Sequence, residues 1–177
     1  MSAGALIVIA LRLLIPLTIL RWPLFGGIAS MIIDALDVVL ISLMNLGGFD
    51  GYYHTLDKVL DSYYLSIEFY IALGWENGWA RWPALVLFPF RMIGVVLFEV
   101  THQRTMLFIF PNLFENWWLY VVAVARFWPQ LTPSSWRSTL TPLALLLIPK
   151  IAQEYLLHFA EVQPWDWFKR VVLRGTI

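Results

Sequence analysis

The chain consists of long apolar runs separated by short polar or turn-forming stretches. Such runs are typical of helices that cross a hydrocarbon core of roughly 30 Å. Six can be drawn: about residues 4–20, 27–45, 56–74, 84–100, a fifth that follows a short apolar piece ending at Pro111 and reaches about 128, and 140–160. The pattern therefore predicts an all-α fold, a polytopic integral membrane bundle with about six transmembrane helices in residues 1–162.

The first apolar run is not predicted to be a signal peptide, and the last fifteen residues are not predicted to be a further membrane span. No basic segment precedes the first apolar run, and Arg12 lies in its middle, so we expect this run to be retained as a helix. Residues 163–177 mix tryptophan and phenylalanine with lysine and arginine, which is typical of a short amphipathic helix at the membrane interface.

A recurring motif lies near the predicted helix ends. Arg21-Trp22-Pro23 precedes the second run, Arg81-Trp82-Pro83 precedes the fourth, and Arg126-Phe127-Trp128-Pro129 closes the fifth. With six spans, all three copies fall on the same side of the membrane. Tryptophan and arginine at one depth are typical of an interfacial belt, so we expect membrane lipids as partners.

Composition agrees with this class and excludes others. Of the 177 residues, 60% are hydrophobic and only 14% are charged, and the mean hydropathy is +0.71. A soluble domain carries about 25% charged residues. The net charge is zero, which gives no reason to expect nucleic acid as a partner. Cysteine is absent, so any metal would need oxygen or imidazole ligands. We expect a multi-pass protein of a prokaryotic plasma membrane.

Ionisable residues inside the predicted spans are unusually numerous. Eight are acids: Asp34, Asp37, Asp57, Asp61, Glu68, Glu99, Glu115 and Glu154. Five are bases: Arg12, Lys58, Arg91, Arg126 and Lys150. A charge near the bilayer centre costs roughly 2.5–3.5 kcal/mol on insertion scales, so these groups must face one another, water or a bound ion. The excess of acids favours protonated carboxyls or a bound cation.

Four aspartates stand at helical spacings on consecutive predicted spans. Asp34 and Asp37 are three residues apart, and Asp57 and Asp61 are four apart, so each pair shares one helix face. In this order, the Asp-x2-Asp and Asp-x3-Asp pairs resemble the metal-binding half of the CDP-alcohol phosphotransferases, which are six-span enzymes that make phospholipids. The chain differs from the signature of that family at Val38 and at Ile41-Ser42, where the family has Gly and Ala-Arg.

The resemblance implies a role for each residue. Asp34, Asp37, Asp57 and Asp61 would bind a divalent cation, Mg²⁺ or Mn²⁺, because hard oxygen ligands suit these ions. Asp61 would also be the catalytic base for an acceptor hydroxyl. Lys58 or Arg91 would contact the phosphate of the nucleotide-linked substrate. The chain would then be a metal-dependent phosphotransferase that acts on a phosphate-bearing lipid.

A second interpretation needs no catalysis. The polar interior would be structural or conductive, in a proton- or cation-coupled transporter or in a non-enzymatic membrane subunit. Such a chain would work as a homo-oligomer or inside a larger membrane complex. The pairs Glu99-x2-His102 and Glu154-x3-His158 contain the residue types of a carboxylate–histidine metal site. Such a site needs two pairs with the same Glu-x2-His spacing, and the second pair is one residue too long. We therefore favour polar histidines with no metal at both positions.

Overall fold

The structure is a computed structural model, and it describes residues 3–43 and 53–160, without the side chains of residues 3–5, 37–43, 53–55 and 158. All of its regular elements in these ranges are helical. They are α1 (Ala3–Leu14), the 3₁₀ segment η1 (Ile15–Leu20), α2 (Pro23–Leu43), α3 (Tyr53–Leu73), α4 (Gly78–Thr101), α5 (Thr105–Ile109), α6 (Leu113–Phe127), the 3₁₀ segment η2 (Pro129–Leu131), α7 (Trp136–Glu154) and the π-helical turn η3 (Tyr155–Phe159). The predicted all-α fold is confirmed for this part of the chain.

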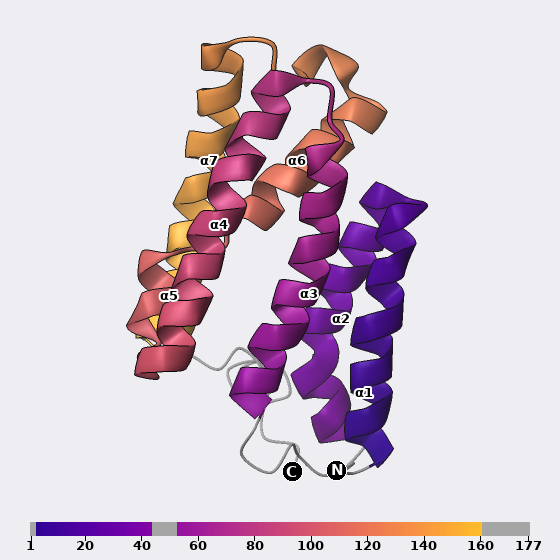
Figure 1. Ribbon diagram of the computed structural model, residues 1–177, viewed down its shortest axis with the longest axis vertical. Coiled ribbons are helices and arrows are strands. Elements are labelled where there is room, and N and C mark those ends of the chain that lie inside the picture. Colours follow the sequence, from indigo (N-terminus) through magenta and orange to yellow (C-terminus); the bar gives the residue numbers. More distant parts are fainter. Residues whose placement is uncertain (1–2, 44–52, 161–177) are drawn as a thin grey trace, which may run out of the picture.

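The long helices run alternately up and down (Figure 1). Helices α1, α2 and α3 lie together on one side of the molecule, and α4, α5 and α7 lie on the other. Helix α6 stands between the two groups and contacts α2, α3, α4 and α7. This central helix supplies the largest buried side chains, among them Phe114, Trp117 and Trp118, none of which is exposed.

Capping side chains explain where two of the helices begin. The side chain of Asn77 accepts from the backbone N–H groups of Trp79 and Ala80 at the start of α4. Ser135 and Ser138 exchange hydrogen bonds in a capping box at the start of α7. Each cap satisfies backbone donors that have no partner inside the helix, so both starts are fixed by the local sequence.

Three helices begin four or more residues earlier than the hydrophobic runs predict. Helix α2 starts at Pro23 and not near residue 27, α4 at Gly78 and not near 84, and α7 at Trp136 and not near 140. Arg81-Trp82-Pro83 therefore lies inside α4 and does not precede it. The first residues of these helices are turn-forming or polar types that do not resemble an apolar run: Pro23 opens α2, Gly78 opens α4, and Arg137-Ser138-Thr139 follow the first residue of α7. Proline is tolerated at the first position of α2 because the N–H it lacks has no intrahelical partner.

Fewer than six of the described helices are long and apolar enough to count as membrane spans. Two described helices are long and apolar enough to cross a membrane: α4, and α7 with the residues after it to Leu157. The segments Leu6–Leu20 and Pro23–Leu36 are apolar but shorter. A bundle of six spans stays a prediction, and the predicted interfacial tail at 163–177 lies outside the described residues.

Candidate functional site

Three of the predicted aspartates come together where α2 and α3 face each other. Asp57 and Asp61 project from the same face of α3, and Asp34 approaches them from α2. One carboxylate oxygen from each lies within 4.8 Å of the other two. The side chains are 30%, 16% and 14% exposed for Asp34, Asp57 and Asp61, so the group is largely shielded from solvent.

Arg12 of α1 is the centre of this acidic group. Its Nη1 donates to Asp57 Oδ1 at 2.7 Å, and its Nη2 donates to Asp61 Oδ1 at 2.5 Å and to Asp34 Oδ1. The guanidinium is only 3% exposed. One planar group with several fixed donors can bind carboxylates from two helices at once, which a lysine cannot do in the same geometry. Arg12 thereby joins α1 to α2 and α3.

Lys58 completes the group from the other side of the carboxylates. Its Nζ lies 2.8 Å from Asp57 Oδ2 and 2.9 Å from Asp61 Oδ2, and the side chain is 14% exposed. We call Arg12, Asp34, Asp57, Lys58 and Asp61 the aspartate cluster. It carries three formal negative and two formal positive charges, so one negative charge is in excess.

Two residues predicted for this site are not placed in it. The backbone of Asp37 lies in α2, one helical turn after Asp34, but its side chain is outside the described residues. Arg91 lies on α4 and is 4% exposed; its Nη1 donates to the backbone carbonyls of Leu107 and Phe110, at 3.3 and 3.0 Å. Arg91 thus holds the α5 segment against α4, and neither of these contacts involves the aspartate cluster.

The donor set of the cluster suits a hard divalent cation, but the geometry sets a condition. Mg²⁺ binds oxygens at about 2.1 Å, so two ligands of one ion lie at most about 4.2 Å apart. Carboxylate oxygens up to 4.8 Å apart must therefore move slightly inward. Arg12 already donates to Oδ1 of all three aspartates. A cation and this guanidinium would compete for the same oxygens.

A second buried polar group lies around α6. Glu115 is 7% exposed and accepts from the Tyr64 hydroxyl at 2.7 Å and from the Asn112 side-chain amide at 3.0 Å. The backbone N–H of Asn112 donates to Glu154, which pairs with Lys150 at 3.2 Å. The sequence showed the acids and Lys150 but not Tyr64 or Asn112. Only the position of Asn112, next to Pro111 at a helix start, could have indicated its role.

Of the three histidines, the structure describes the side chain of His102. His102 is exposed and ends α4 in the left-handed conformation, with φ of 55°. The side chains of His54 and His158 lie outside the described residues. Within the described part of the chain, the group of acids and histidines that could hold a metal is the aspartate triad.

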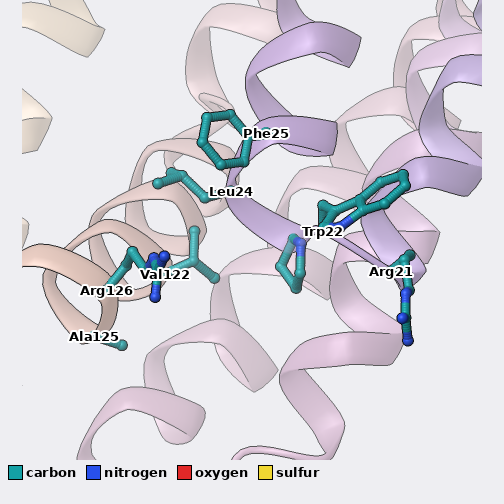
Figure 2. A pocket seen from close by; sticks show the side chains of 8 residues that line it. Arg21, Trp22, Leu24, Phe25, Val122, Ala125 and Arg126 are labelled. Carbon is teal, nitrogen blue, oxygen red and sulfur yellow. The ribbon is translucent and has the colours of Figure 1, made fainter.

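A surface cleft of about 480 Å³ lies near the ends of η1 and α6 (Figure 2). Arg21, Trp22 and Phe25 line it from one side, and Val122 and Arg126 line it from α6. Two arginines beside large exposed aromatic side chains are typical of the level of lipid headgroups. The cleft thus joins the first and third copies of the recurring motif.

Comparisons of this chain with family models, with curated proteins and with solved structures found no match.

Proposed function

We propose that this is an integral membrane protein whose aspartate cluster binds a divalent cation and transfers a phosphate-bearing group on a lipid. The observation that carries the proposal is the cluster itself. It places three carboxylate oxygens within reach of one another beside two basic groups. Carboxylates that hold a cation, next to arginine and lysine, are the combination that phosphoryl transfer needs.

The distribution of side chains supports the membrane location. Ionisable residues such as Arg12, Glu68 and Glu154 are buried, whereas Phe25, Val100 and Ile148 are 68%, 74% and 69% exposed. Many other large apolar side chains are exposed on the outer faces of the helices. A soluble protein rarely exposes large contiguous apolar areas, whereas a lipid-facing surface requires them.

In this proposal each residue of the aspartate cluster has a defined role. Asp34 and Asp57, and Asp37 from the next turn of α2, would hold the cation, which would neutralise charge on a phosphate or pyrophosphate when bound. Arg12, once a cation displaces it from the carboxylates, and Lys58 would bind the phosphate oxygens, since both are cationic donors. Asp61 would accept the proton of the acceptor hydroxyl as the new oxygen–phosphorus bond forms and the bond to the leaving phosphate breaks.

A proton- or cation-coupled transporter is the second candidate. The hydrogen-bonded series of Tyr64, Glu115, Asn112 and Glu154 favours it, because this series crosses the bundle from α3 through α6 to α7. Intramembrane acids that are linked in this way are typical of ion paths. This candidate does not require a metal at the aspartate cluster.

Manganese binding separates the two candidates. Protein in lipid nanodiscs is titrated with Mn²⁺ while free ion is followed by electron paramagnetic resonance. We expect saturable binding by the wild type and at least tenfold weaker binding by Asp57→Asn and Asp61→Asn. Glu76→Gln is the matched control, because Glu76 is an exposed acid between α3 and α4. Binding that is absent from the wild type, or equal in all four proteins, would refute the metal site.

Catalysis needs its own measurement. The same nanodiscs, prepared with CDP-diacylglycerol, are incubated with Mn²⁺ and a mixture of small alcohols, and release of CMP is followed by chromatography. We expect CMP release that depends on Mn²⁺ and on Asp61. Saturable Mn²⁺ binding without such release would reject the nucleotide-linked lipid as donor while leaving the cation site in place.

A further inference from the structure

Glu68 is the most completely buried acid of the described chain. It lies on α3 and its side chain is not exposed at all. Neither carboxylate oxygen has a hydrogen-bond partner within the described residues. An ionised carboxylate without a hydrogen-bond donor in an apolar interior is one of the costliest states that a side chain can adopt.

The surroundings of Glu68 are tightly packed and apolar. A side-chain carbon placed on Gly27 of α2 would lie 3.3 Å from Glu68 Oε1 and only 2.7 Å from the Trp118 ring of α6. Leu65 on the same helix is 1% exposed, and Trp118 is fully buried. The carboxyl group is therefore enclosed where α2, α3 and α6 meet, at a point where α2 approaches closely because residue 27 has no side chain.

Glu115 lies on α6, and its hydrogen bond to Tyr64 brings its carboxylate to the side of α3 that also carries Glu68. Unlike Glu68, it has donors: the Tyr64 hydroxyl at 2.7 Å and the Asn112 amide at 3.0 Å. Tyr64 lies one helical turn before Glu68 on α3, so both side chains face α6. Hydrogen bonds to one of two neighbouring carboxyls favour the charged form of that one, and the like charge disfavours ionisation of the other.

The other charged groups near this junction have partners of their own. Arg12 of α1 and Asp34 of α2 belong to the aspartate cluster, and η1 carries no titratable side chain. On α4, Arg91 donates to carbonyls of the α5 segment, and Glu99 lies two turns further along. From α7, Lys150 pairs with Glu154. Among the described residues, none of these bases forms a hydrogen bond to Glu68.

We propose that Glu68 binds a proton at the junction of α2, α3 and α6, and that Glu68 and Glu115 form a proton-binding pair in which Glu115 carries the negative charge. The ligand is a proton because Glu68 supplies a single carboxyl group and a metal ion needs several oxygen ligands. The inference does not depend on metal binding or catalysis at the aspartate cluster, since Glu68 is a separate group that lies seven residues after Asp61 on α3.

Infrared spectroscopy of the protein in lipid nanodiscs at neutral pH tests this proposal. A protonated carboxyl group gives a C=O stretching band that is separate from the bands of ionised carboxylates. We expect one such band in the wild type, its loss in Glu68→Gln, and its retention in the matched control Glu76→Gln. Because Gln is neutral and has the shape of a protonated Glu, Glu68→Gln should unfold within about 2 °C of the wild type, which would show that the band is lost without loss of the fold.

Two results would overturn the proposal. One is a wild-type spectrum without the band, or a band that persists in Glu68→Gln. The other is a band that is absent in NaCl and appears when sodium is replaced by a large organic cation, because Glu68 would then be ionised and would hold a monovalent metal ion. A band that Glu68→Gln keeps and Glu115→Gln loses would assign the proton to Glu115 and would contradict the proposal.

Discussion

Replacement of Arg12 by Gln tests whether the aspartate cluster holds the first three helices together. The side chain is 3% exposed and donates to Asp34, Asp57 and Asp61. Its removal raises the excess negative charge of the cluster from one to two and leaves Lys58 as the base in contact with the aspartates. Breaking a buried ion pair by removing one partner costs about 3–5 kcal/mol. Lys58 stays in contact with Asp57 and Asp61 and compensates part of the charge that Arg12 leaves, so the loss should fall below this range.

The expected loss of stability is therefore about 1–3 kcal/mol, below the cost of leaving a buried charge with no partner. For a chain of this length, 1 kcal/mol corresponds to about 2–4 °C in Tm, so Arg12→Gln should unfold about 2–12 °C below the wild type. Thermal unfolding in detergent, followed by tryptophan fluorescence, measures this difference. Arg137→Gln is the control, because Arg137 is exposed in the first turn of α7 and should change Tm by less than about 2 °C.

The same unfolding measurement, repeated with Mn²⁺, tests whether a cation competes with Arg12. Because Arg12 and a cation would compete for the same Oδ1 atoms, Mn²⁺ should raise the Tm of Arg12→Gln more than that of the wild type. Equal Tm values for Arg12→Gln and the wild type without metal would refute the central role of Arg12. A destabilised variant that Mn²⁺ does not stabilise would leave the ion pairs in place as a packing device and would refute competition with a cation.

Packing and capping give further predictions that the same unfolding assay checks. Gly26→Ala should lower stability by about 1–3 kcal/mol, because the new carbon would lie 2.4 Å from a backbone atom of η1. Gly78→Ala is its control, with nothing within 4 Å of the new carbon, and should leave Tm unchanged or slightly higher. Asn77→Ala should cost about 2 kcal/mol, since it removes the cap of α4 and a 2.7 Å bond to the Pro133 carbonyl. Ser135→Ala should cost about half as much, and the reverse order would contradict the account of the caps.

The helices and the pairing of acids along each of them were accessible from the sequence. The helical period alone places Asp57 and Asp61 on one face, and the structure brings both into the aspartate cluster. The same reasoning left helix starts too late at α2, α4 and α7, because a first turn with proline, glycine or polar residues does not resemble an apolar run. Asn77 and Ser135 were the available signals for two of these starts.

The partners of the buried charges were not accessible in the same way. Arg12 was visible as a base inside the first run, but nothing local shows that it meets three aspartates, since the contacts join residues 22 to 49 positions apart. Arg91 was predicted to contact phosphate, and in the structure it donates to the backbone carbonyls of Leu107 and Phe110. A long flexible cation can satisfy acids or carbonyls equally well, so only its place in the packed bundle decides between them.

The sequence by itself determined the all-helical fold, the apolar exterior and the concentration of acids on two consecutive helices, because period and composition act within each helix. Tertiary structure decided which charges share a site. It placed Arg12 and Lys58 among the aspartates, and it left Glu68, beside Trp118, without a hydrogen-bond donor from the described part of the chain. The physical reason is that a charge inside a bundle is stabilised by groups from other helices, and the rotation and depth of those helices are set by packing.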